Sequence, residues 1–224
     1  MCGRYSLHAH PEVIALYFKL GLPPAIKARY NIAPGTQVLI VRQDQEHGRI
    51  ADLYRWGLMP GWAKDPATGN KLSNARGETV AEKPSFRNAF KRSRCLIPAS
   101  GFYEWQSVRG RKQPYYIYPK DRELFGLAGI TGLWQDPDGP VHACAIITTG
   151  PNDLMKNIHD RMPVILRPED YSTWLDPNNQ ATAELKQLLK PCPAAAMAAH
   201  PVSPRVNTAK HDDPVLLEPI ESTV

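Results

Sequence analysis

The chain has 224 residues, of which 42% are hydrophobic and 22% are charged, and its formal net charge is +5 at pH 7. This length and balance fit a globular protein with a substantial core and exclude a chain that ends in a disordered acidic or basic tail. The 22 prolines against 15 glycines imply many fixed turns and argue against a helical bundle. The positive net charge is compatible with a polyanionic partner without requiring one.

The first half of the chain predicts a helix, a strand pair and a second helix. Pro11 suits the first turn of a helix, and the apolar residues after it follow helical spacing. Two alternating segments flank a polar turn, and Phe86 and Phe90 stand four residues apart, as on one helix face. The expected elements are a helix over Pro11–Leu20, strands over Gln37–Arg42 and Arg49–Trp56, a proline-interrupted loop over Gly57–Trp62, and a helix with a basic outer face around Phe86 and Phe90.

The second half is rich in strands up to Thr149 and in short helices after it. Turn dipeptides such as Arg109-Gly110 separate segments of β-branched and aromatic residues, a pattern typical of antiparallel hairpins. The expected strands are Phe102–Gln106, Tyr115–Tyr118, Leu124–Trp134 and Val141–Thr149. The expected helices are Asn152–Asn157, Pro168–Leu175 and Thr182–Leu189, followed by a linker over Pro191–Ala199. Because no repeat, low-complexity tract or composition shift marks a boundary, we expect one α+β domain over residues 1–224.

The four cysteines stand far apart, and none belongs to a CxxC pair. Neither a metal site nor a disulfide framework is indicated, and we expect no cofactor. Cys144 lies in an apolar run and is expected to be buried. The chain begins without an apolar signal region, and no apolar stretch reaches membrane-spanning length. We therefore expect a cytoplasmic protein with no membrane partner.

Cys2 directly follows the initiator Met1. Removal of Met1, which is common when the second residue is small, would give Cys2 an α-amine with a pKa of about 7.7 to 8.0 beside a thiol with a pKa of about 8.5. Such an amine condenses with an aldehyde to an imine, and the thiol can then close a five-membered thiazolidine ring. A cysteine inside a chain lacks this chemistry. The sequence therefore predicts a nucleophile at its first processed residue, although chain termini are commonly mobile and without function.

Three internal polar segments could serve that nucleophile. Ser73–Thr79 combines an Asn, an Arg and a Glu, and it could equally be the start of a helix. Glu104 stands between two aromatic residues in a predicted strand, where partial burial would raise its pKa toward neutrality, unless the side chain faces water. His159 leaves a predicted helix beside Asp160 and Arg161, and its pKa near 6.5 suits it to move protons.

Taken together, these segments form an ordered set of motifs. They are Met1-Cys2-Gly3-Arg4-Tyr5, Arg29-Tyr30-Asn31-Ile32-Ala33-Pro34-Gly35, Trp56-Gly57-Leu58-Met59-Pro60-Gly61-Trp62, Asn74-Ala75-Arg76, Gly101-Phe102-Tyr103-Glu104-Trp105 and His159-Asp160-Arg161-Met162-Pro163. In residue type and order, this set resembles the SOS-response-associated peptidase-like (SRAP) family over nearly the whole chain.

The resemblance implies an α+β fold, a single domain with an antiparallel, barrel-like β core and peripheral helices. It also implies a sensor that shields abasic sites in single-stranded DNA through a thiazolidine cross-link. By resemblance, Cys2 is the nucleophile and Asn74 orients it. Glu104 would move protons during imine formation and ring closure, while His159 would assist sugar ring opening and reversal of the adduct.

The resemblance also implies a DNA-binding set around these groups. Arginines would clamp the phosphates that flank the lesion, and a tryptophan and a methionine would stack against bases beside the gap. An asparagine and the turn after it would shape the groove. In that order, these residues are Arg4, Arg76 and Arg161, then Trp62 and Met59, and finally Asn31 with Ala33–Gly35. The Trp62 side chain could instead pack in the core.

The partner that follows is single-stranded DNA containing abasic sites, bound by a monomer that associates with the nucleoid. Replication and repair proteins are further candidate partners, and lyase-type activity and autoproteolytic removal of Met1 are candidate activities. Two other readings stay open. An N-terminal cysteine peptidase or amidotransferase-like hydrolase would use the α-amine as a base for its own thiol, whereas a non-covalent single-strand-binding module would not need Cys2.

Overall fold

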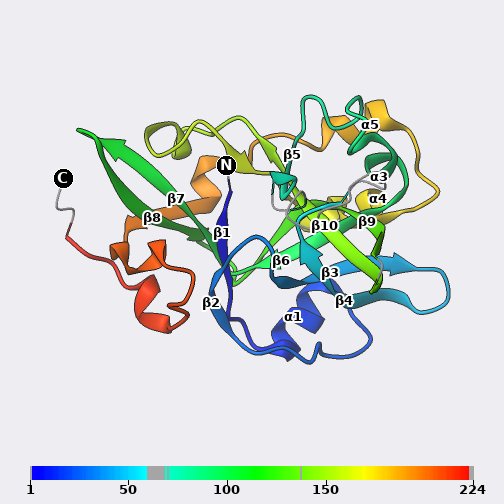
Figure 1. Ribbon diagram of the computed structural model, residues 1–224, viewed down its shortest axis with the longest axis horizontal. Coiled ribbons are helices and arrows are strands. Elements are labelled where there is room, and N and C mark those ends of the chain that lie inside the picture. The colour runs from blue at the N-terminus through cyan, green and yellow to red at the C-terminus, as the bar shows by residue number, and fades with distance from the viewer. Residues whose placement is uncertain (1, 60–68, 70, 137, 222–224) are drawn as a thin grey trace.

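The computed structural model describes residues 2–59, 69, 71–136 and 138–221 (Figure 1). Its strands are β1 (Arg4–Leu7), β2 (Arg29–Ile32), β3 (Gln37–Asp44), β4 (Gly48–Trp56), β5 (Asn74–Arg76), β6 (Arg94–Ala99), β7 (Gly101–Val108), β8 (Arg111–Pro119), β9 (Phe125–Asp136), β10 (Gly139–Thr149), β11 (Met162–Pro163), β12 (Ile165–Leu166) and β13 (Met197–Pro201). The α-helices are α1 (Pro11–Phe18), α3 (Arg87–Arg92), α4 (Tyr171–Leu175) and α5 (Thr182–Gln187). Short 3-10 helices are η1 (Met155–Asn157), η2 (Pro168–Asp170), η3 (Ala194–Ala196), η4 (Pro204–Asn207) and η5 (Pro214–Leu217).

The strands form two sheets that share one core. The five-stranded sheet has the order β13-β8-β7-β1-β2, and the eight-stranded sheet has the path β11-β10-β4-β3-β6-β9-β12, with β5 paired to β10. Buried side chains from both sheets belong to one hydrophobic cluster. The α+β class with a barrel-like β core and peripheral helices is confirmed. The pairing is not wholly antiparallel, however, because β10 runs parallel to both β4 and β5.

The central strands carry few polar residues because both of their faces are covered. All six residues of β6 are buried, as are residues 143–149 of β10, including Cys144. A strand covered on both sides reads as a continuous apolar run. The Trp56 indole nitrogen at the end of β4 donates to the Ser73 carbonyl at 2.8 Å, so β4 is tied to the segment that leads into β5.

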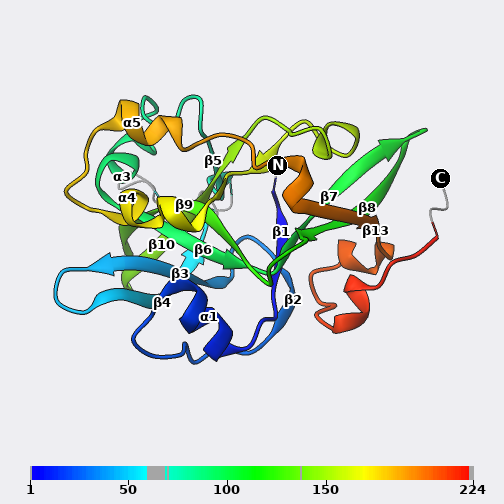
Figure 2. The same cartoon turned by 180° about the vertical axis from the view of Figure 1, so that it is seen from behind.

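The helices lie around the edge of the β core (Figures 1 and 2). The helix α1 ends at Phe18, two residues before its predicted end, because Lys19 adopts a left-handed conformation with φ 57° and ψ 51°. The helix α3 is confirmed, with Phe90 buried and Arg87, Lys91 and Arg92 exposed. None of the described helices is both long and apolar enough to span a bilayer.

The structure corrects the predicted linker, confirms one short helix only in part, and decides the open alternative at Ser73–Thr79. The segment predicted as a linker, Pro191–Ala199, contains η3 and the first residues of β13, which pairs with β8. The helix predicted over Asn152–Asn157 is reduced to the single turn of η1. The start of Ser73–Thr79 is strand rather than helix, because Asn74–Arg76 pairs with β10. Pairing with a distant strand overrides the intrinsic propensity of the first and the third segment. The second segment forms only one helical turn.

Arg94, the first residue of β6, is buried although it follows the exposed basic residues of α3. Its side chain is 5% exposed, and its guanidinium donates to five backbone carbonyls around the ends of α3 and α4: Phe90, Lys91, Trp174, Asp176 and Asn179. Buried charges need such partners. Arg94 therefore joins two helices to β6 and leaves the surface charge to its neighbours.

Candidate functional site

Cys2 lies two residues before β1, at the edge of the shared core. Strand β1 pairs with β7 in the register Arg4 opposite Tyr103, and the start of the chain therefore runs beside Glu104, whose carboxylate acts on the Cys2 thiol. The Cys2 side chain is fully buried. Burial, and then the nearby Glu104 carboxylate, raise the pKa of its thiol. The thiol is therefore held protonated in the resting protein.

Asn74 contacts Cys2 from the second sheet. The parallel pairing of β5 with β10 places Asn74 opposite Ile146, and its Nδ2 donates to the Cys2 carbonyl at 2.9 Å and to Ser73 Oγ at 3.2 Å. Its Oδ1 is buried and has no hydrogen-bond partner within the described part of the chain. Asn74 thus fixes the Cys2 backbone and also offers an acceptor beside it.

Glu104 projects from β7 into the same region and is 2% exposed. Burial raises the pKa of its carboxyl to about 7, because a low-polarity environment disfavours the charged form. This confirms the desolvation that its aromatic neighbours suggested. A carboxyl that titrates near neutral pH can both take up and release a proton.

His159 approaches Glu104 from the turn after η1. Its Nε2 lies 3.8 Å from Glu104 Oε2, while its Nδ1 accepts from the Arg161 backbone N–H at 3.0 Å. In the neutral ring this acceptor role places the remaining proton on Nε2, facing Glu104. Asp160 Oδ1 is also 3.0 Å from Nδ1, but its side chain is 87% exposed, so solvent screens it. Burial lowers the pKa of His159.

A cleft of about 390 Å³ opens beside this pair and is lined by Glu104, Trp105, Lys112, His159 and Asn207. The Trp105 indole nitrogen donates to Asn207 Oδ1 at 2.7 Å, which holds the ring at the wall of the cleft. Trp105, Lys112 and Asn207 were not among the predicted site residues. Trp105 belongs to the motif around Glu104, and Lys112 follows the turn at Arg109, so the sequence held a signal for each. No feature of the sequence connected Asn207 to this cleft.

Arg4 and Asn31 are brought together, and their polar groups face the C-terminal segment. Arg4 Nη1 donates to Asn31 Oδ1 at 2.7 Å and to the Val206 carbonyl at 2.6 Å. Asn31 is 2% exposed, and its Nδ2 donates to the carbonyls of Val206, Thr208 and His211. These two residues therefore support the wall of the cleft that carries Asn207.

The other predicted DNA-binding residues have separate surroundings. Arg76 is exposed at the end of β5, whereas Arg161 makes a two-pronged ion pair with Glu78. Met59 is 3% exposed and packs with Trp134 and Ala143, an environment typical of core packing. Trp62 lies outside the described residues.

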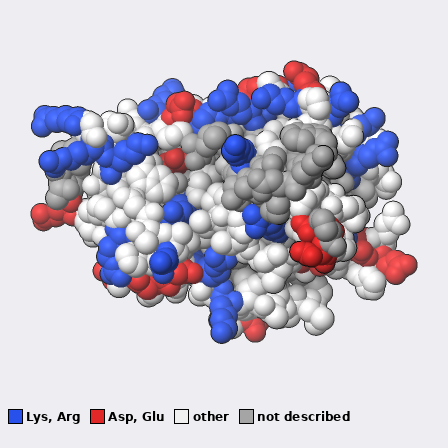
Figure 3. Space-filling model, in the orientation of Figure 1, with Lys and Arg blue, Asp and Glu red and all other residues white. Residues whose placement is uncertain are grey.

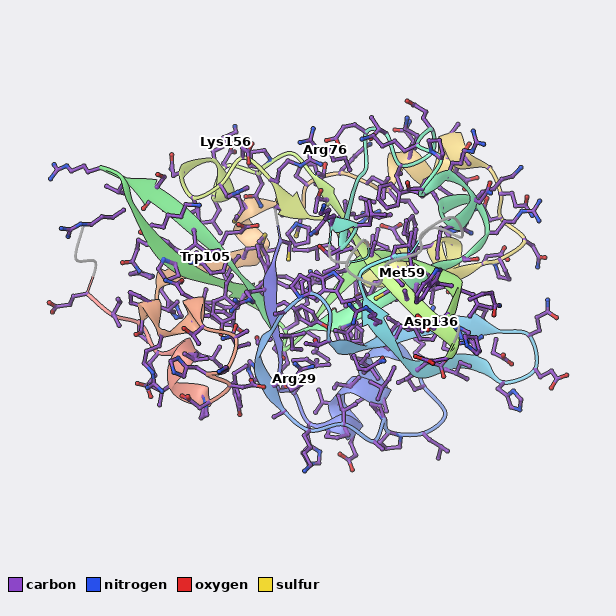
Figure 4. The ribbon with its side chains drawn as sticks, in the orientation of Figure 1. Arg29, Met59, Arg76, Trp105, Asp136 and Lys156 are labelled. Carbon is purple, nitrogen blue, oxygen red and sulfur yellow. The ribbon has the colours of Figure 1, made fainter. Side chains whose placement is uncertain are left out.

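Positive charge gathers along one edge of the molecule, the upper edge in Figure 3. The tip of the β7–β8 hairpin contributes exposed Arg109, Arg111 and Lys112. Arg76 and Lys156 lie along the same edge (Figure 4). This edge therefore suits a polyanionic strand.

No set of three or more His, Cys, Asp and Glu side chains within the described ranges is arranged to hold a metal ion. The reactive groups that do converge are a thiol, an amide, a carboxyl and an imidazole, from Cys2, Asn74, Glu104 and His159. Together they offer a nucleophile, an orienting group and two groups that can carry protons. The pKa of Glu104 is raised toward neutrality, and the pKa of His159 is lowered.

The chain is similar to characterised sequences along its length. The profile of the SOS response associated peptidase (SRAP) family matches residues 1–209. Abasic site processing protein YoqW of Bacillus subtilis (strain 168) is 44% identical over 223 residues, covering 97% of this chain and 99% of that protein. Abasic site processing protein HMCES of Gallus gallus is 38% identical over 207 residues, covering 81% of this chain and 61% of that protein. A crystal structure of a protein from Bacteroides thetaiotaomicron has a TM-score of 0.87 at 29% identity and covers 98% of this chain and all of that one.

Proposed function

This chain belongs to the SRAP family, and from that premise we propose that it processes abasic sites in DNA by trapping them covalently on Cys2. The relatives named above as abasic site processing proteins support the substrate. The site supports the chemistry, since an abasic deoxyribose opens to an aldehyde and an N-terminal cysteine offers the two nucleophiles that capture one. Single-stranded DNA is the proposed form of the substrate, because a strand without a partner exposes the sugar.

The proposed reaction has two bond-forming steps. After Met1 is removed, the Cys2 amine attacks the aldehyde carbon and water leaves, which gives an imine. The Cys2 sulfur then adds to the same carbon, its proton passes to the nitrogen, and a thiazolidine ring closes. No oxidant or cofactor is consumed. The overall change is loss of one water molecule and formation of one C–N and one C–S bond.

The neighbouring side chains have complementary roles in this proposal. Asn74 holds the Cys2 carbonyl through Nδ2 and offers Oδ1 to the amine that Met1 removal releases. Glu104 takes the proton that the amine or thiol must lose, because its pKa of about 7 allows both forms at neutral pH. His159 is the second proton carrier, placed to open the sugar ring and to protonate the adduct during reversal.

The observation that carries the proposal is the convergence on a buried Cys2 of Asn74 from one sheet and of Glu104 with His159 from the other side. A terminus without a function would not be surrounded in this way. Non-covalent binding alone would not require it either. Exposed Arg76, near the same site, is the proposed phosphate contact for the flanking strand.

The test is cross-linking to single-stranded DNA that carries one abasic site, made by excising uracil from a defined oligonucleotide. We expect a denaturant-resistant protein–DNA band that is lost in Cys2→Ala, and intact-mass measurement should show a chain without Met1. A matched oligonucleotide without the lesion is the control.

Three outcomes would contradict the proposal. An adduct with the intact oligonucleotide would show that the aldehyde is not the target, and an equal yield from Cys2→Ala would exclude the thiol. Salt-sensitive binding without any adduct would favour the non-covalent module. Cys2-dependent release of ammonia from glutamine, or cleavage of a peptide substrate, without any adduct would favour the hydrolase reading.

A further inference from the structure

Thr148 is a point of contact between the two segments that carry Asn74 and His159. Its carbonyl, near the end of β10, accepts from the Gly77 N–H at 2.8 Å and from Arg161 Nη2 at 2.8 Å. Gly77 stands three residues after Asn74, and Arg161 stands two residues after His159. Thr148 is fully buried, so this shared carbonyl connects the two segments inside the protein.

Glu78 completes the connection from the opposite side of the guanidinium. Its Oε1 and Oε2 accept from Arg161 Nη1 and Nη2 at 2.7 and 2.9 Å, and Thr148 Oγ1 accepts from Nη2 at 3.1 Å. The Arg161 side chain is only 14% exposed. A two-pronged arginine–carboxylate pair has a defined geometry as well as strength. The Arg161 side chain is therefore held in one place by the segment that carries Asn74.

The backbone of Arg161 acts on His159 directly. Its N–H donates to His159 Nδ1, and in the neutral ring this bond favours the form that carries its proton on Nε2, toward Glu104. Arg161 thus contacts both segments: its guanidinium pairs with Glu78 on the segment that carries Asn74, and its backbone N–H orients the His159 ring.

Resting on the proposed cross-linking function, we propose that Glu78 is a positioning residue of that reaction. Its carboxylate holds Arg161 across Thr148 and so keeps the Asn74 segment and the His159 turn in a fixed relation around Cys2. Nothing in the resemblance assigned a role to Glu78, and this role differs from the phosphate contact expected of Arg161.

The experiment compares Glu78→Gln with Glu82→Gln in cross-linking rate as a function of DNA concentration. Glu82 is a matched control, because it lies on the same segment and pairs with Lys186 instead of Arg161. We expect Glu78→Gln to lower the maximal rate about tenfold or more, since small displacements of reacting groups have effects of this size. The half-saturating DNA concentration should not change, and Glu82→Gln should behave as the wild type.

A double-mutant comparison separates positioning from general loosening of the fold. If Glu78 acts through His159, then Glu78→Gln should change the rate by less than about twofold in a His159→Gln background. An equal loss in both backgrounds would overturn the proposal. A wild-type rate for Glu78→Gln would also overturn it, as would tighter DNA binding with a steeper salt dependence, which would mean that Glu78 only occupies a phosphate site on Arg161.

Failure of this inference can be told from failure of the proposed function. If the wild type and Glu82→Gln form no adduct, the cross-linking function itself is wrong. If both form it and Glu78→Gln does so equally well, only the role of Glu78 is wrong. Glu78 is half-exposed, so its replacement should not unfold the chain. Should it do so, Thr148→Val removes a hydroxyl acceptor of the same guanidinium and should also lower the maximal rate, and an unchanged rate would count against the proposal.

Discussion

Glu104 is the residue whose ionisation burial changes most clearly. Burial raises the pKa of its carboxyl from 4.5 to about 7, so the folded chain favours the protonated form. The same side chain in an exposed strand position would be ionised at neutral pH and a poor proton donor. Its two aromatic neighbours suggested this environment, but only the packing of β1 against β7 decides which way the side chain faces.

Replacing Glu104 with Gln should make stability depend on pH in a defined direction. A raised folded-state pKa stabilises the fold fully below about pH 4.5 and loses that contribution as pH rises through about 7. Gln resembles the protonated acid. Glu104→Gln should therefore match the wild type at about pH 4.5 and have a higher free energy of unfolding at about pH 8, by on the order of 2 kcal/mol.

Urea unfolding at the two pH values measures this difference. Glu123→Gln, on an exposed residue, is the control for the same replacement at the surface. A stability difference for Glu104→Gln that is the same at both pH values would count against a raised pKa.

Among the elements, the short strands were the hardest to predict. The longer strands β3, β4, β9 and β10 follow alternating or continuous apolar patterns, and they agree with the segments expected from the sequence. The strand β5 has only three residues, and its Asn could equally have been a helix cap. It becomes a strand through parallel pairing with β10, some 70 residues later in the chain, and local sequence carries little information about such a distant partner.

The candidate site shows the same limit. Cys2, Asn74, Glu104 and His159 were chosen from motifs, and the structure brings them together. The motif residues Arg4 and Asn31, by contrast, bond to carbonyls in the C-terminal segment, 175 residues or more away from them in the chain. A polar side chain in a motif can thus bind a ligand or form hydrogen bonds with a distant part of the backbone. The motif alone does not show which of the two it does.

The C-terminal segment that carries η4 and η5 depends on Asn31. Removing this side chain leaves the His211 carbonyl without its Asn31 donor, takes one of two donors from each of the Val206 and Thr208 carbonyls, and removes an acceptor of the Arg4 guanidinium. We expect Asn31→Ala to lower the free energy of unfolding by about 2 to 3 kcal/mol, because unpaired buried polar groups are costly. Urea unfolding tests this. Asn88→Ala, on an exposed position of α3, should have an effect below about 0.5 kcal/mol.

At the scale of the whole molecule, exposed cations from separate segments gather along one edge (Figure 3). The net charge of +5 alone could not show this, because it says nothing about where the charges lie. The fold brings the hairpin turn at Arg109, the segment with Lys156 and the end of β5 to one side. Long-range strand pairing therefore turns scattered basic residues into one surface.

Replacing Arg76 on this edge should weaken DNA binding in a salt-dependent way. Each lost phosphate contact reduces the slope of log affinity against log salt by about 1, so Arg76→Gln should reduce it by about that amount. Lys27→Gln, an exposed cation on the connection between α1 and β2, is the control and should leave the slope unchanged. Fluorescence anisotropy with a Cys2→Ala background measures affinity without cross-linking. An unchanged slope for Arg76→Gln would remove Arg76 from the binding surface.

The full burial of Cys2 also bears on the chemical lifetime of the protein. Peroxides and alkylating agents attack the thiolate of a cysteine, and they do so most readily at exposed positions with low pKa. A covered sulfur that remains protonated is a poor target for both. In the proposed reaction this burial would protect Cys2 from the reactive small molecules that consume an exposed thiol and keep it for an electrophile held directly against it.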